Sequence, residues 1–195
     1  NEHPPVVCFD PNNENQILLA YIGTFSTREY VIASATITGT SSITLGTPVA
    51  FTGTGSNYQL TGGMLSFDSN NTSTPTFGMV YVTDDGYGRF YNRAGTISGN
   101  TITLGTATEL GGGAGMAAWS AEQLTAISFN TTGTFVINGR ASPADGYVFV
   151  RAGTISGTTI TLGTSVTLFS DYGTTGNAPP DPNAPTKFVT AWRES

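Results

Sequence analysis

The sequence predicts an all-β fold made of a repeated unit of about 50–60 residues, read about three and a half times in a chain of 195 residues. Three observations lead to this prediction. Thr, Val, Ile, Tyr and Phe are plentiful and helix formers are scarce, which favours extended chain. Three segments end in the same Ile-Thr-Leu-Gly-Thr sequence, at 35–47, 94–106 and 152–164. A second motif, an Asp or Asn turn followed by an apolar run, occurs upstream in each unit.

The spacing of the two motifs defines the units. The Leu-Gly pair begins at 45, 104 and 162, and the Asp or Asn of the turn motif lies at 10, 68, 130 and 181. Insertions therefore fall between units, while the unit itself is preserved. We expect one β-repeat domain over 1–195, with units at about 4–57, 60–112 and 116–172 and a partial unit at 177–195.

Each full unit is predicted to contain four strands, as the first unit illustrates. A short strand at 6–9 is followed by an Asp-Pro-Asn-Asn turn, because Asp and Asn bond their own backbone and Pro presets φ. The second strand, 16–22, is almost continuously apolar, which predicts burial on both faces. Strands at 29–37 and 42–51 complete the unit.

The third and fourth strands are predicted to meet in tight Gly-bearing hairpins, at 98–100 and 156–158. The first copy has one extra residue here, so its turn should be looser. Gly105 and Gly163 interrupt the fourth strand. They predict either a bulge or a close approach of neighbouring backbone.

Four antiparallel strands repeated at this length are typical of a β-propeller blade, with apolar inner strands and a Thr-rich outer strand. The sequence therefore predicts a propeller-like array of four-stranded blades. The chain begins at a first strand and stops after the second strand of the fourth unit, which leaves two sheet edges unpaired. We expect the polypeptide to continue beyond Ser195 as part of a larger propeller. Two chains in one ring, or a linear fibre, are the alternatives.

Composition argues against several classes of function. A net charge of −6 disfavours nucleic-acid binding, and no apolar run approaches the ~18 residues of a membrane span. Cys8 is the only cysteine, so no intrachain disulfide can form. His3 is the only histidine, which makes Ser-His-Asp or Cys-His catalysis an unexpected function.

The acidic residues favour turns over chemistry. Asp10, Asp68 and Asp181 occupy the same repeat position, so a turn role explains them without a glycosidase carboxylate pair. The segment 10–14 lacks the central Gly and distal Glu of an EF-hand calcium loop. We expect no catalytic residues, no metal and no cofactor, and hence not an enzyme.

The repeat resembles that of tail-fibre-like and other virion structural proteins of bacteriophages, particularly aquatic ones. The resemblance rests on Phe-Asp-Pro-Asn at 9–12, apolar strands ending in Ala-Tyr or Ala-Trp-Arg, and Gly-Thr-Ile-Ser-Gly-x-Thr-Ile-Thr-Leu-Gly-Thr at 95–106 and 153–164. It implies a β-propeller and a structural or host-recognition role, as a fibre, spike or decoration protein in the virion. The partners it implies are other virion subunits, in a homo-oligomer, with no catalytic motif shared.

The alternative is an extracellular or cell-surface adhesin or filament subunit that binds glycans. Tyr58, Trp119 and Tyr172 lie near unit junctions, have no repeat equivalents and could stack on a sugar of the host surface. Subunit contact or plain packing would equally explain these three rings. Asn-x-Ser/Thr sequons occur at Asn70, Asn71 and Asn130, and they matter only if the source adds N-glycans.

Overall fold

The computed structural model describes residues 5–24, 29–51, 57–59, 65–84, 89–110, 126–140, 148–169, 173–175, 180–181, 184–188 and 192–194. All regular secondary structure in these ranges is β-strand, so the all-β prediction is confirmed. The strands pair antiparallel throughout. No helix in the described ranges is long and apolar enough to cross a membrane.

The first sheet, called unit 1 here, has the strand order β1-β2-β3-β4, and β5 also pairs with β3. Its strands are β1 (Val6–Phe9), β2 (Gln16–Thr24), β3 (Glu29–Thr38), β4 (Ser42–Leu45) and β5 (Val49–Ala50). The four predicted strands are confirmed, with one difference. The fourth is split into β4 and β5 around Gly46, because β3 is paired first with one part and then with the other.

The second sheet, unit 2, repeats this arrangement. Its strands are β6 (Asn57–Gln59), β7 (Leu65–Phe67), β8 (Thr76–Asp84), β9 (Arg89–Ser98), β10 (Thr101–Leu104) and β11 (Thr108–Glu109). Both β6 and β7 pair with β8, and both β10 and β11 pair with β9. The outer strand is again interrupted, here around Gly105.

The third sheet, unit 3, has the order β12-β13-β14-β15, and two short strand pairs follow it. Its strands are β12 (Ala126–Thr131), β13 (Thr134–Arg140), β14 (Val148–Ser156) and β15 (Thr159–Phe169). The pairs join β16 (Gly173–Thr175) to β19 (Trp192–Glu194), and β17 (Pro180–Asp181) to β18 (Ala184–Phe188). We call these four short strands partial unit 4, since they stand where the first and second strands of a further unit would be.

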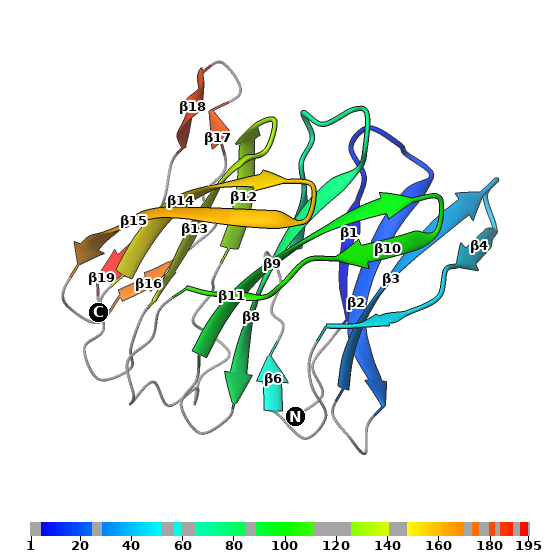
Figure 1. The fold of residues 1–195 in the computed structure, drawn as a ribbon, viewed down its shortest axis with the longest axis horizontal. Coiled ribbons are helices and arrows are strands. Elements are labelled where there is room, and N and C mark those ends of the chain that lie inside the picture. The colour runs from blue at the N-terminus through cyan, green and yellow to red at the C-terminus, as the bar shows by residue number, and fades with distance from the viewer. Residues whose placement is uncertain are drawn as a thin grey trace.

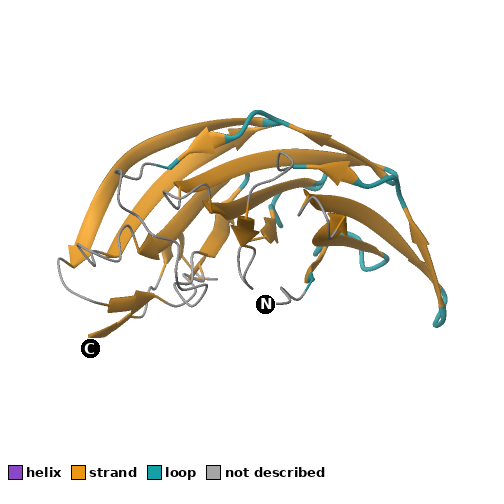
Figure 2. Ribbon diagram, turned by 90° about the horizontal axis from the view of Figure 1, so that it is seen from below, coloured by secondary structure: helices purple, strands orange, loops and turns teal. Residues whose placement is uncertain are grey.

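The units follow one another side by side along an open arc (Figures 1 and 2). Their first strands are neighbours: β1 contacts β7, β7 contacts β12, and β12 contacts β17 and β18. Each unit therefore has a front face, turned toward the preceding unit, and a back face, turned toward the following one. Within the described residues the sheets do not close into a ring.

The core consists of apolar layers between adjacent units, because a second strand buries both of its faces. In β8, Phe77 and Met79 belong to the layer shared with unit 1, while Val80 belongs to the layer shared with unit 3. The burial of β2 fits the same prediction, with Ile17 and Leu18 on opposite faces of the strand and both buried. Packing between units, rather than within one sheet, is what stabilises this fold.

Candidate functional site

The structure does not bring the three predicted glycan-contact residues together. Tyr58 lies in β6, where its backbone pairs with Thr83, but its side chain falls outside the described residues. Trp119 and Tyr172 also fall outside them. The best-defined site in the described part is instead the junction between adjacent units, which occurs twice with the same geometry.

The hairpin turn of one unit rests on a glycine of the unit before it. A Cβ atom on Gly46 of unit 1 would overlap the carbonyl oxygen of Asn100 in unit 2. A Cβ atom on Gly105 of unit 2 would likewise overlap the carbonyl oxygen of Thr158 in unit 3. The predicted close approach at Gly105 is confirmed, and its cause is the turn of the next unit. Only a residue without a side chain leaves room for that turn.

Gly163 is the equivalent residue in unit 3, and its surroundings differ. An added Cβ atom there would meet only the carbonyl oxygen of Ala152, at 3.1 Å, within the same sheet. The pairing of β14 with β15 shifts register between Arg151 and Gly153, beside this glycine. Of the two predicted alternatives, Gly163 therefore shows the bulge.

An arginine on the third strand ties each junction together. The Nε atom of Arg93 donates to the carbonyl oxygen of Gly105 in its own unit at 2.6 Å. Its Nη1 atom donates to the carbonyl oxygen of Phe51 in unit 1 at 3.0 Å. One guanidinium thus fixes both its own interrupted outer strand and the last residue of the preceding unit.

Arg151 repeats these contacts one unit later. Its Nε atom donates to the carbonyl oxygen of Gly163 at 2.7 Å, and its Nη1 atom to that of Leu110 in unit 2 at 2.9 Å. Sequence reasoning missed this role, although Arg-Ala-Gly-Thr-Ile-Ser occurs at both 93–98 and 151–156. The signal was the recurrence of an arginine at a fixed distance before the hairpin.

The predicted turn role of the aspartates is confirmed for the two whose side chains are described. The Oδ1 atom of Asp10 accepts from the amide of Asn12 at 2.9 Å, and that of Asp68 from the amide of Asn70 at 3.1 Å. Asp68 also joins two units, because its Oδ2 atom accepts from the amide of Gly133 at 2.6 Å. Structural contacts therefore occupy these carboxylates.

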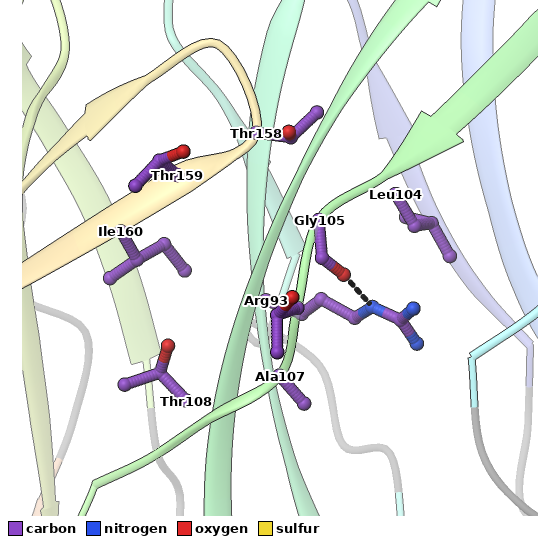
Figure 3. A pocket seen from close by; sticks show the side chains of 9 residues that line it. Arg93, Leu104, Gly105, Ala107, Thr108, Thr158, Thr159 and Ile160 are labelled. Carbon is purple, nitrogen blue, oxygen red and sulfur yellow. Dashed lines mark hydrogen bonds between the residues drawn. The ribbon is translucent and has the colours of Figure 1, made fainter.

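A groove of about 680 Å³ opens at the outer end of the junction between units 2 and 3 (Figure 3). It is lined by Arg93, Leu104, Gly105, Thr106, Ala107, Thr108, Thr158, Thr159 and Ile160. Its lining offers hydroxyl and backbone groups beside two apolar side chains, with no carboxylate, imidazole or thiol. Such a surface can hold a hydroxyl-bearing ligand by hydrogen bonds, but it offers no acid–base pair.

The remaining chemical candidates are structural. Burial raises the pKa of the Cys8 thiol, a backbone hydrogen bond with Phe67 lowers it, and the Asp10 carboxylate raises it, with a net upward shift. The thiol is therefore protonated at neutral pH and a poor nucleophile. In the described part of the chain, no group of three or more His, Cys, Asp or Glu side chains is placed to hold a metal ion.

No protein-family model, curated protein or solved structure matches this chain. The functional argument therefore depends on the geometry of the junctions and on the resemblance of the repeat.

Proposed function

We propose that this chain is a non-enzymatic structural module of a virion component, such as a fibre, spike or decoration protein, and that its units are consecutive blades of a β-propeller. The observation that carries the proposal is the recurrence of the junction. The same glycine seat, turn and arginine bridge join unit 1 to unit 2 and unit 2 to unit 3.

A junction of this kind suits a protein that must keep its shape. Each one combines a buried apolar layer, two charge-assisted hydrogen bonds from a guanidinium and a turn seated against backbone. Repeating it sets a constant relation between neighbouring sheets, and the resulting curvature supports the propeller interpretation (Figure 2). Extended rigid modules of this type are useful where contacts with other subunits have to be held in register.

The virion location is supported by the resemblance of the repeat to virion structural proteins of bacteriophages. Other virion subunits, including further copies of this chain, would be the partners. The test is the protein content of virus particles purified from the source culture, measured by mass spectrometry and by immunogold electron microscopy. We expect the chain at a fixed ratio to the major capsid protein, with label on fibres, spikes or capsid; its presence only in the host-cell fraction would overturn the proposal.

The Thr-lined groove favours a second candidate, an extracellular adhesin or filament subunit that binds glycans. Its hydroxyl groups and the apolar surface of Leu104 and Ile160 match the mixed character of a sugar. A glycan array probed with wild type and with Tyr58→Ala, Trp119→Ala, Tyr172→Ala and Thr158→Val would test it. No glycan bound, or unchanged binding by all four variants, would count against this function.

A further inference from the structure

One half of the back face of unit 3 is uncovered, although the corresponding surfaces of units 1 and 2 are buried. Ser34 in unit 1, Ala94 in unit 2 and Ala152 in unit 3 occupy the same register position, opposite the second strand. The first two are fully buried, whereas Ala152 is exposed. Val166 shows the same change, since it is 56% exposed while its equivalents, Val49 and Thr108, are half-buried.

The other half of this face is covered by partial unit 4. β16 contacts β13 and β14, and β17 and β18 contact β12. These short strands stand where the first and second strands of a next unit belong. In the described residues, β18 pairs only with β17, and β19 only with β16. What the surface lacks is therefore a third and a fourth strand.

We propose that the exposed surface formed by Ala152, Gly163, Val166 and Leu168 is a docking site for a β-hairpin with the third- and fourth-strand sequence of the repeat. The occupant is defined by chemistry: a Ser-Gly-x-Thr turn, an arginine five residues before that turn, and an Ile-x-Leu pair after it. All three features are present in units 2 and 3. This inference depends on the blade stacking in the proposed function and not on the virion location.

The two existing junctions show how each feature of the hairpin would engage. The turn would rest on Gly163 as the turn at Thr158 rests on Gly105. The arginine would donate to the carbonyl oxygen of Leu168, the residue equivalent to Phe51 and Leu110. The Ile-x-Leu pair would cover Val166, since Ile102 and Leu104 pack in the same way on the core shared with unit 1.

Backbone pairing would supply the rest of the affinity. The third strand of the hairpin would add to the free edges of β18 and β19, as an extended peptide adds to a sheet edge. The same pairing occurs within unit 2, where β9 adds to β8 over eight residue pairs, from Thr76↔Thr96 to Thr83↔Arg89.

The experiment uses the whole chain and a synthetic peptide with the sequence of residues 89–110. Binding is read from thiol labelling of Val166→Cys in a Cys8→Ser background, which reports directly on coverage of the surface. We expect saturable binding and a fall in labelling rate of about tenfold or more. A peptide carrying Arg93→Ala should bind about tenfold more weakly, because hydrogen bonds from a charged donor are lost.

Gly163→Val on the receptor tests the seat. Its side chain would occupy the place of the turn, so we expect binding to weaken about tenfold or more, while the unfolding midpoint in urea stays near that of the parent. Thr164→Val, at the exposed neighbouring position, is the matched control and should bind normally. Absence of saturable binding at about 1 mM peptide, or equal binding by the Gly163→Val variant, would overturn the proposal.

Because an isolated hairpin is only marginally stable, a second measurement removes the dependence on its folding. The sequence of residues 85–110 is appended after Ser195, which makes docking intramolecular. The Val166→Cys thiol should then label about tenfold more slowly than in the unextended chain, and Gly163→Val should restore the rate. An unchanged rate on extension contradicts the proposal. Neither readout depends on the protein content of virus particles, so the failure of this inference and that of the proposed function are distinguishable.

Discussion

Unit 1 and unit 2 have the same strand order but differ on their front faces. Where unit 2 has Arg93, unit 1 has Ala33, at the same register position. The two-residue turn between Ser98 and Thr101 becomes a three-residue turn between Thr38 and Ser42. The features that hold a unit on its predecessor are thus present in units 2 and 3 and missing from unit 1.

The exposure of apolar side chains follows the same division. On the front face of unit 1, Val7, Phe9, Ile43 and Leu45 are 47% to 65% exposed. Their counterparts in unit 2 are part of the layer shared with unit 1: Leu65, Phe67, Ile102 and Leu104. Burial in this fold is therefore decided by the neighbouring unit and not by the residue type.

The glycine seats give the largest expected effect. Gly105→Ala would place a Cβ atom against the backbone of Thr158, which cannot rotate away, so we expect a loss of about 2–3 kcal/mol in the free energy of unfolding. Gly163→Ala, whose nearest neighbour is the Ala152 carbonyl oxygen at 3.1 Å, should lose less than about 1 kcal/mol. Urea denaturation measures both. Equal losses would mean that the turn of unit 3 does not rest on Gly105.

A compensated pair in the core gives the next effect. Phe77 faces Gly95 across the strands of unit 2, whereas the equivalent pair in unit 1 is Ile17 and Ala35. A Cβ atom on Gly95 would lie 2.7 Å from Cε1 of Phe77, so Gly95→Ala should destabilise by about 2 kcal/mol.

The rescue of this pair is specific. Adding Phe77→Ile to Gly95→Ala recreates the unit 1 pair, and we expect a favourable coupling energy of about 1 kcal/mol between the two substitutions. A double-mutant cycle by urea denaturation measures it. Strictly additive losses would contradict the interpretation that ring and glycine fit each other.

The arginine bridge should contribute somewhat less. Arg93→Ala removes hydrogen bonds to the carbonyl oxygens of Gly105 and Phe51, for an expected loss of about 1.5 kcal/mol. Arg93→Lys should recover less than half of it, because one ammonium does not reproduce the forked guanidinium geometry. Thermal unfolding of the three proteins measures the effect, and full recovery by lysine would show that charge alone matters.

The smallest expected effect has the opposite sign. Asn92 is fully buried, and neither its Nδ2 nor its Oδ1 atom has a hydrogen-bond partner. Its register equivalents are Ile32 and Val150, so Asn92→Val should stabilise by about 1 kcal/mol. Asn138, also fully buried, takes part in a polar interaction, and Asn138→Val should not stabilise. A raised urea midpoint for Asn92→Val alone is the expected result.

Much of the fold could be predicted because strand identity is local. The bounds expected for the first strand, 6–9, are those observed, and the second and third strands of unit 1 extend the prediction by two residues and one residue at their C-terminal ends. Alternation, turn residues and the repeat period all act within a few residues of one another, so they can be read from the chain. The split of the fourth strand could be anticipated only as an interruption at glycine.

The junction could not be predicted, because its partners are about 40 to 65 residues apart in the chain. Arg93 and Phe51 meet across units, as do Asp68 and Gly133. Nothing local distinguishes an arginine that bridges two sheets from one that faces water. The predicted glycan residues, Tyr58, Trp119 and Tyr172, stay predictions, since their side chains lie outside the described part of the chain.

The sequence by itself determined the repeat, the four antiparallel strands of each unit and the places of the turns, since backbone propensity and side-chain period decide these. Only the tertiary structure decided why Gly105 has to be glycine, which arginines join the units and which apolar residues lie open at either end of the arc. Those properties depend on what packs against a residue from the next unit, and packing partners are set by the assembled fold.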